Sequence, residues 1–308
     1  MDRVECDNRF LGKAKMKILC LGSSGFVGSV LLNHLRNHSD WEVKGINSLS
    51  LDLLNPGSIE KLANQLDEDT ILIYSVRATD SKSPWEKLKV DLEMVHNVTD
   101  ALAQKRVRRC IFFSTFAVYD DSITQLNITE KTNVCPQSLY GVAKFAGECL
   151  LAQVAAKKKF PLVILRPCKI YGPGDQNFEY GPGSFLYSAL MGKPVRLYGD
   201  GLELRDHLFI EDLVQIVRHF VHNDESGVYN LASGISLTYQ DTLSIVRRVI
   251  NKEFEIIHEA RTRLQVDQTV DISHLKQAVP ELNLTSLEQG ICKTFRDMEQ
   301  RLSREALY

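Results

Sequence analysis

The stretch KILCLGSSGFVGSVLLNHLRN, residues 17–37, joins a run of apolar residues to a glycine-rich turn and then to apolar residues at helical spacing. This order predicts a β-strand that leads into an α-helix. The turn holds three glycines in the pattern Gly22-x-x-Gly25-x-x-Gly28, a spacing variant of the fingerprint of dinucleotide-binding folds. We therefore expect an α/β fold of that kind to begin here.

The three glycines have distinct expected roles. Gly22 lets the chain turn off the strand, Gly25 lets the backbone approach a pyrophosphate, and Gly28 lets the helix pack closely on the strand. The N-terminus of the helix would then face the negative charge of the ligand. A glycine-rich turn without a ligand is the alternative that this pattern leaves open.

Further apolar runs follow, with helical patterns between them: WEVKGIN at 41–47, DTILIYSV at 69–76, RRCIFFSTFAVY at 108–119 and FPLVILRPCKIY at 160–171. Strands that are apolar almost throughout are typical of a parallel sheet covered on both faces. We predict an α/β fold with a Rossmann-type doubly wound parallel sheet over residues 16–170. A smaller α/β substrate lobe would span 171–308, with a soft boundary and some segments crossing back. Ligands of such sheets bind at the carboxyl ends of the strands.

The composition narrows the class of protein. The chain has 308 residues, 44% of them hydrophobic and 25% charged, and a net charge of −2, which gives no overall field for nucleic acid or a membrane surface. The basic clusters at 105–109 and 157–159 are interpreted as solvated last turns of helices. No apolar run reaches membrane-spanning length, and the polar first residues lack a signal-peptide pattern. We expect a cytoplasmic protein with neither nucleic acid nor membrane as partner.

The cysteines show no Cys-x-x-Cys pair, and several lie inside apolar strand or helix patterns. The seven are Cys6, Cys20, Cys110, Cys135, Cys149, Cys168 and Cys292. This usage predicts free, buried thiols in a reducing compartment and no disulfide framework. We expect no metal site.

The end of the second strand bears on the cofactor. An acidic residue is expected about 20 residues beyond the glycines if it is to bind a ribose 2′-hydroxyl, but Asn47 stands there. A neutral amide neither requires a free 2′-hydroxyl nor repels a 2′-phosphate. Both NAD and NADP therefore remain possible.

Five motifs in order carry a resemblance to a known family. After the glycine turn come FFSTFAVY at 112–119, SLYGVAK at 138–144, LRPCKIYGPGD at 165–175 and LYGDGLELRDHLFIEDL at 197–213. This order resembles the extended short-chain dehydrogenase/reductase family, and within it the NAD-dependent epimerases and dehydratases that act on nucleotide sugars. The resemblance covers nearly the whole chain, and it implies an NAD(P) cofactor and a nucleotide-sugar substrate.

The resemblance implies a catalytic set. Tyr140 matches the tyrosine that exchanges a proton with the sugar oxygen, and Lys144 lies one turn further along the same helical face. The ammonium, together with the charge of an oxidised nicotinamide, would lower the phenol pKa from its ordinary value of ~10, and it would also bind the ribose hydroxyls. Thr115 matches a hydroxyl that hydrogen-bonds the reacting oxygen. An ordinary helix turn for the Tyr/Lys pair, a strand-end hydroxyl for Thr115 and a packed aromatic for Tyr119 are the alternative readings.

The resemblance also implies ligand contacts. Asp52 and Leu53 would lie beside the adenine, although a solvent-exposed turn is the alternative for Asp52. Lys169 stands where the family often has Asn, and it could meet a diphosphate as a point charge; Arg205 matches the family's diphosphate-binding arginine. Asp206 and Asp212 are expected to tie their segment to its neighbours. The remaining expected cofactor contacts are Ser24, Phe26, Val27, Ser75, Val76, Ser114 and Pro167.

Departures from the family narrow the reaction. Dehydratases carry an acidic pair directly after the catalytic Ser/Thr, where this chain has Phe116 and Ala117. The bifunctional epimerase-reductases carry a Cys and a His where this chain has Ala117 and Gly174. Cys168 and His207 do not match those positions, so a packed thiol and a structural histidine are expected. Hydride transfer at C4 is what remains.

Two activities fit hydride transfer at C4. The short connection between 47 and SLDLLNP at 50–56 favours a 4-keto sugar reductase over a nucleotide-sugar 4-epimerase, which usually has a helix there. A ketone or steroid reductase would not need Arg205, and a non-catalytic NAD(P)-binding module would typically lack the Tyr/Lys pair. The predicted helices at 91–104 and 140–156 carry wide apolar arcs, and relatives commonly pair them in a homodimer. We therefore expect a homodimer.

Overall fold

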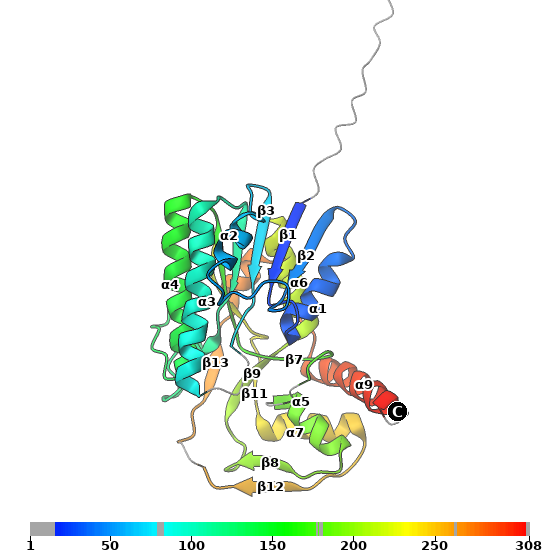
Figure 1. The fold of residues 1–308 in the computed structure, drawn as a ribbon. Coiled ribbons are helices and arrows are strands. Elements are labelled where there is room, and N and C mark those ends of the chain that lie inside the picture. Colours follow the sequence, from blue (N-terminus) through cyan, green and yellow to red (C-terminus); the bar gives the residue numbers. More distant parts are fainter. Residues whose placement is uncertain (1–15, 79–82, 177, 179–180, 262–263, 306–308) are drawn as a thin grey trace, which may run out of the picture.

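The computed structural model describes residues 16–305 except 79–82, 177, 179–180 and 262–263. A six-stranded sheet forms its upper half (Figure 1), and every neighbouring pair in it is parallel. The strands, in spatial order, are β10 (Gly227–Leu231), β6 (Leu162–Pro167), β4 (Arg109–Phe113), β3 (Thr70–Tyr74), β1 (Met16–Leu21) and β2 (Trp41–Ile46). The predicted Rossmann-type α/β fold is confirmed.

Alternation along each strand builds two cores, one on each face of the sheet. Ile18 and Cys20 pack with α1 (Phe26–Arg36) and α6 (Ile210–His222). Leu19 and Leu21 belong to the opposite core, to which the other helices contribute: α2 (Ser58–Ala63), α3 (Pro84–Gln104) and α4 (Leu139–Lys158). The sheet is therefore covered on both faces, as near-continuous apolar strands require.

Helices α3 and α4 lie side by side on one face of the sheet (Figure 1). The predicted start of α3 at residue 91 is wrong, because the helix begins at Pro84. Ser83 caps it, its side chain accepting a hydrogen bond from the Glu86 backbone while the Glu86 carboxylate accepts one from the Ser83 backbone. Such a reciprocal cap stabilises a helix N-terminus. Asp91 is consequently an interior residue of α3.

The lower lobe consists of small sheets and helices (Figure 1). One sheet joins β7 (Lys169–Tyr171), β9 (Leu204–Phe209) and β11 (Ser236–Thr238), a second pairs β8 (Val195–Tyr198) with β12 (Ile256–Glu259), and β5 (Gln125–Ile128) pairs with β13 (Gln268–Val270). The helices of this lobe are α5 (Gly181–Leu190), α7 (Tyr239–Ile250) and α9 (Leu287–Glu305). Helix α8 (Ser273–Ala278) instead packs against β10 of the six-stranded sheet, and the 3-10 turn η1 (Phe116–Val118) packs against α4. Strand β10 pairs with β6, so the chain crosses back to the first sheet after β9.

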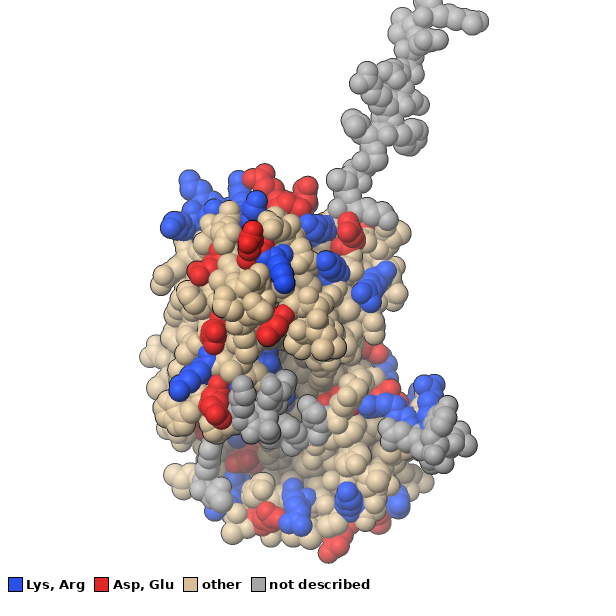
Figure 2. All heavy atoms as spheres, in the orientation of Figure 1, with Lys and Arg blue, Asp and Glu red and all other residues tan. Residues whose placement is uncertain are grey.

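The surface charges and the exposure of the cysteines can be compared with the predictions from the sequence. Lys and Arg are interspersed with Asp and Glu over the face shown in Figure 2. No helix within the described residues is long and apolar enough to cross a membrane.

The prediction of buried thiols holds for Cys20 and Cys110 but is wrong for Cys135 and Cys149, which are exposed. Cys6 lies outside the described residues. Cys149 is exposed because it lies on the outer face of α4, which the apolar pattern alone did not reveal.

Candidate active site

The glycine turn has a shape that suits an anionic ligand. Gly22 adopts φ +88°, a value that favours glycine. A Cβ on Gly28 would lie 2.1 Å from the Gly22 carbonyl oxygen, so only glycine permits this close packing of α1 on the turn. Gly25 caps α1 without a side-chain hydrogen bond, and the first turn of α1 carries no acidic residue. The backbone N–H groups at this N-terminus are therefore suited to a phosphate.

The segment after β2 contains the residues expected to bind the adenosine part of the cofactor, and it exposes only some of them. The Asn47 side-chain oxygen accepts a hydrogen bond from the Ser50 backbone at 3.0 Å, and exposed Asp52 accepts one from the Leu54 backbone at 3.0 Å. Leu53 is only 7% exposed and packs in the core beneath α2 and α3. Asn47 and Asp52 lie at the surface of this segment, whereas the Leu53 side chain points into the protein.

Lys144 lies at the carboxyl ends of two neighbouring strands. Its amine donates hydrogen bonds to the Val76 carbonyl at 2.9 Å, just beyond β3, and to the Phe113 carbonyl at 3.0 Å, the last residue of β4. Ser75, next to Val76, donates to the Leu21 carbonyl at 2.8 Å. Lys144 thus brings together three elements at the edge where ligands of parallel sheets bind.

A buried network fixes the segment that follows β4. Ser114 donates a hydrogen bond to Glu148, which pairs with Arg166 at 2.6 Å. Arg166 also donates to the Tyr119 hydroxyl at 2.9 Å, and that hydroxyl donates to Asn230 at 2.8 Å. Tyr119 is therefore a packed, fully buried aromatic. Because Glu148 lies one turn beyond Lys144 on α4, this network holds the segment that begins at Ser114 against α4.

Tyr140 and Thr115, which the resemblance assigns to the same reacting oxygen, lie near one another. The Thr115 side chain lowers the pKa of the Tyr140 phenol. Desolvation by the surrounding protein is the larger effect and raises that pKa, even though 38% of the Tyr140 surface is exposed. The nearby positive charge that lowers this pKa is Arg77, and the expected lowering by Lys144 together with an oxidised nicotinamide stays a prediction.

Lys144 itself is strongly affected by its surroundings. It is 6% exposed, and burial lowers the pKa of its amine from 10.5 to about 8. The charge of Asp91 raises this pKa, and that of Arg77 lowers it. A lysine in this range holds a proton at neutral pH but can lose it in mildly alkaline solution.

The expected substrate cations belong to the lower lobe. Lys169 on β7 donates a hydrogen bond to the Tyr239 hydroxyl at 2.7 Å. Arg205 on β9 donates to the carbonyls of Leu204, at 2.8 Å, and Val266, and its side chain is 17% exposed. Both cations are thus engaged with protein groups in the chain without substrate.

The remaining polar residues of β9 and α6 have structural partners. Asp206 accepts a hydrogen bond from the Ser233 backbone at 2.7 Å, and Asp212 accepts two from Thr285; the predicted tying role of both is confirmed. His207 is 6% exposed, neither ring nitrogen has a hydrogen-bond partner, and burial lowers its pKa to about 3. Burial raises the pKa of the Cys168 thiol, so the packed-thiol reading is confirmed.

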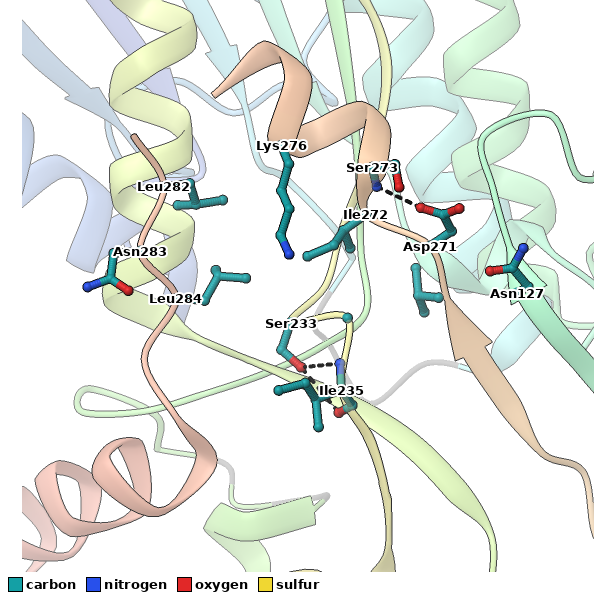
Figure 3. A pocket seen from close by; sticks show the side chains of 12 residues that line it. Asn127, Ser233, Ile235, Asp271, Ile272, Ser273, Lys276, Leu282, Asn283 and Leu284 are labelled. Atoms are coloured by element: carbon teal, nitrogen blue, oxygen red, sulfur yellow. Dashed lines mark hydrogen bonds between the residues drawn. The ribbon is translucent and has the colours of Figure 1, made fainter. Parts of the chain in front are cut away.

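A separate pocket lies away from this site. Its volume is about 510 Å³, and Lys276 from α8 points into it between Leu284 and Ile272 (Figure 3). Asn127, Ser233 and Asp271 contribute polar groups, but neither Tyr140 nor Lys144 lines it. No group of three or more potential metal-ligating side chains occurs within the part of the chain that the structure describes.

The structure brings Tyr140, Lys144, Thr115 and the ends of β3 and β4 together. It also reveals two charged residues near them, Asp91 and Arg77, that sequence reasoning missed. The signal available for Asp91 was an acidic residue between the apolar Val90 and Leu92, in a helix whose other face is buried. The contact itself depends on how α3 packs against α4.

With this geometry established, comparison with known families is decisive. Residues 18–232 match the model of the NAD dependent epimerase/dehydratase family. The chain belongs to this family. The match begins in β1 and ends just after β10. It therefore contains the six-stranded sheet except for the first two residues of β1, and it contains Thr115, Tyr140 and Lys144.

Members of the family with related sequences or folds carry different activities. The chain is 25% identical to the uncharacterized UDP-glucose epimerase YtcB of Bacillus subtilis, covering 90% of this chain and 96% of that protein. It is 26% identical to the dTDP-glucose 4,6-dehydratase of Haemophilus influenzae, covering 76% and 78%. The structure of UDP-glucose 4-epimerase from Thermotoga maritima with UDP-glucose aligns with a TM-score of 0.82 at 20% identity, over 93% and 100% of the chains, which shows a shared fold.

Proposed function

We propose that the protein is an NAD(P)-dependent enzyme that transfers hydride to and from C4 of a nucleotide sugar. The particular activity that we propose is that of a nucleotide-sugar 4-epimerase. One observation carries the proposal: Lys144 is held at the carboxyl ends of β3 and β4, and on the same helix Tyr140 lies near Thr115, which lowers the pKa of its phenol. This places a proton donor and acceptor, a hydroxyl and a cation where parallel sheets bind ligands.

The residues present fit a dinucleotide. The uncapped N-terminus of α1 and the close packing of Gly28 on Gly22 leave backbone N–H groups for a pyrophosphate. Asn47 and Asp52 lie beyond β2, where the adenosine ribose would be bound, and Val76, Ser114 and Pro167 end three neighbouring strands. When bound, the nicotinamide would accept a hydride from the sugar carbon and return it.

The chain's own residues handle the proton. Tyr140 would remove the proton of the C4 hydroxyl as hydride leaves that carbon, and would return the proton to the oxygen when hydride comes back. Thr115 would orient the same oxygen by hydrogen bonding. Lys144, protonated below about pH 8, would stabilise the phenolate that forms in between. Return of hydride to the opposite face of the ketone would invert C4 with no net change in the cofactor.

Two observations support the 4-epimerase over the other activities of the family. A curated relative and an aligned structure carry 4-epimerase or epimerase names, which favours the epimerase over the reductase that the sequence analysis preferred. Against a dehydratase, Thr115 is followed by η1, whose Phe116 and Ala117 supply no acid or base for loss of water. A 4-keto sugar reductase is the second candidate, because only the short helix α2 separates β2 from β3.

The lower lobe would hold the nucleotide diphosphate. Arg205 would offer a planar pair of N–H donors to phosphate oxygens, and Lys169 a point charge. Both now bond to protein groups, so the diphosphate would have to replace those partners. The two cations are therefore the groups that support a nucleotide diphosphate as part of the substrate.

The experiment uses the purified full chain. Cofactor released on denaturation is identified, and the protein is incubated with UDP-glucose and with UDP-galactose while the sugars are followed by proton NMR. Interconversion without net consumption of NAD(H) supports the 4-epimerase. Consumption of NADPH by a 4-keto sugar nucleotide, with no interconversion, would establish the reductase instead, and loss of water from C6 would establish a dehydratase.

A homodimer and a cytoplasmic location stay predictions of the sequence. Helices α3 and α4 display exposed apolar side chains, among them Trp85 at 65% and Val142 at 39% exposure, and such groups are suited to a partner helix pair. Light scattering of the purified protein gives the oligomeric state directly: a mass of twice 34.9 kDa is expected.

A further inference from the structure

Asp91 and Lys144 form hydrogen bonds with the backbone of the residues on either side of Arg77. The Asp91 carboxylate, from α3, accepts a hydrogen bond from the Ala78 N–H at 2.6 Å. The Lys144 amine, from α4, donates to the Val76 carbonyl at 2.9 Å. Two neighbouring helices therefore hold one three-residue segment directly beyond β3, at the edge of the sheet where the nicotinamide is expected.

The same two side chains line a small cavity between α3, α4 and the sheet. The other residues that line it are apolar or aromatic except for the hydroxyl of Tyr74: Val76, Val95, Phe112, Ala143 and Gly147. The Lys144 amine lies 5.2 Å from the centre of the Phe112 ring. Asp91 is the one acidic residue among those that line this cavity. Charges are screened less in such surroundings than in bulk water, and Asp91 raises the pKa of the Lys144 amine.

Four other titratable groups within the described residues act on this pair or are acted on by it. Arg77 faces both Asp91 and Lys144 from the segment after β3, Lys87 faces Asp91 from its own helix, and Tyr140 is influenced by Asp91 from α4. Tyr74 on β3 is also near Asp91, and burial raises the pKa of its phenol far above the physiological range. Burial likewise raises the pKa of Asp91, while the Ala78 N–H and the cations lower it.

We propose that Asp91 is a positioning residue of the active site: its carboxylate is the counter-charge that keeps the Lys144 amine protonated, and its hydrogen bond to Ala78 holds the segment that Lys144 binds. The electrostatic part concerns the free protein and holds whether or not a sugar is turned over. The consequence for catalysis rests on the proposed function, because only there does the Lys144 charge stabilise the Tyr140 phenolate.

The first test is NMR titration of the lysine amines in cofactor-free protein labelled at the lysine side chains, with the Lys144 signal assigned by its loss in Lys144→Arg. Asp91→Asn keeps an oxygen for the Ala78 N–H but loses the charge. The Lys144 midpoint is expected to fall by about one unit or more. Arg77→Gln, at an exposed residue, is expected to raise it, and Asp100→Asn, on the outer face of the same helix, to leave it unchanged.

A reciprocal measurement covers the case in which Asp91→Asn does not fold. Because the interaction between two charges is reciprocal, Lys144→Gln should raise the pKa of the Asp91 carboxylate. The size of this shift should equal the amount by which the Asp91 charge raises the pKa of the Lys144 amine. An unchanged Lys144 midpoint in folded Asp91→Asn, or an unchanged Asp91 midpoint in Lys144→Gln, overturns the proposal.

Activity supplies the second test. In Asp91→Asn, kcat at pH 8 is expected to fall about fivefold if the Lys144 pKa drops by one unit, because the amine of the unsubstituted protein is about half protonated at that pH. It is expected to recover as the pH is lowered, while the KM for the nucleotide sugar changes little. An unchanged pH profile, or a loss of kcat that is equal at every pH, would contradict the counter-charge role. If no nucleotide sugar is turned over by the unsubstituted protein but the NMR shifts occur, the proposed function fails and this inference stands.

Discussion

The two halves of the candidate site differ in what holds their charged side chains. On the sheet side, Lys144 is buried and bonds to the ends of β3 and β4, and Thr115 lies near Tyr140 and lowers the pKa of its phenol. On the lobe side, Arg205 and Lys169 bond to protein groups that a substrate would have to displace. If the proposed function holds, the difference means that the side chains for proton transfer are already placed by the fold, whereas the diphosphate must displace protein partners of Arg205 and Lys169.

The largest expected effect comes from the sheet side. Tyr140→Phe removes the proton donor and acceptor and is expected to lower kcat by roughly a hundredfold to ten-thousandfold. Affinity for NAD should stay within about twofold, because the dinucleotide cradle at Gly22–Gly28 is untouched. Steady-state kinetics and calorimetric NAD binding measure the two. Tyr198→Phe, at a residue that is 58% exposed on β8, is the matched control, and a Tyr140→Phe enzyme retaining a tenth of its activity would rule out the assigned role.

Thr115 gives a smaller, pH-dependent effect. Thr115→Val removes a hydrogen bond worth about 1 kcal/mol, which corresponds to a loss of roughly fivefold to tenfold in kcat. Because Thr115 lowers the pKa of Tyr140, its removal should move the rising limb of the pH–rate profile to higher pH. Thr115→Ser should restore both rate and profile. A profile that does not move, or a serine variant no better than valine, would leave Thr115 as a strand-end hydroxyl only.

A substitution on the lobe side is expected to weaken the binding of the nucleotide and to leave the chemical step unchanged. Arg205→Gln is expected to weaken UDP binding roughly fivefold, less than a preformed charge-assisted contact would, because the arginine must first leave the Leu204 and Val266 carbonyls. Isothermal titration with UDP measures this. The control is Arg196→Gln, whose guanidinium pairs with Glu259 at the surface. Equal UDP affinity in the two variants would remove Arg205 from the site and sharpen the contrast between the halves.

His207 in the lobe should affect stability alone. Its folded pKa of about 3 lies below the ordinary 6.5, so below pH 6.5 the unfolded chain binds a proton that the folded chain does not, and stability falls until about pH 3. His207→Leu should flatten this part of the curve of unfolding free energy against pH while changing stability at pH 7 little. Urea unfolding from pH 7 to 4 checks it, with His96→Gln at an exposed position as control. A steeper curve in His207→Leu would mean that the imidazole is charged in the fold.

The fold was predictable because its signals are local. Glycine spacing, apolar strands and helical periodicity each arise within about twenty residues, and all six strands of the sheet except β10 lie inside the predicted half. The start of α3 was equally local, in the Ser83–Glu86 cap, but was overlooked in favour of the apolar arc. The burial of Leu53 and the exposure of Cys149 depend on which face a neighbour covers, which a short pattern does not reveal.

The site was predictable only in part. Motif order placed Tyr140, Lys144 and Thr115, which the structure brings together. The partners of Lys144 lie 31 and 68 residues away along the chain, and the roles of Asp91 and Arg77 follow from the packing of α3 against α4. Such contacts leave no periodic trace in the sequence, because a charged residue on a helix is compatible with many neighbours.

Isotope transfer at C4 tests the central claim most directly. UDP-glucose carrying deuterium at C4 is incubated with the enzyme in ordinary water, and the product is examined by proton and deuterium NMR. The account predicts an inverted C4 that retains the deuterium, because hydride leaves and returns through the cofactor while Tyr140 moves only the oxygen-bound proton. An inverted C4 whose deuterium has been replaced by hydrogen from water would contradict it.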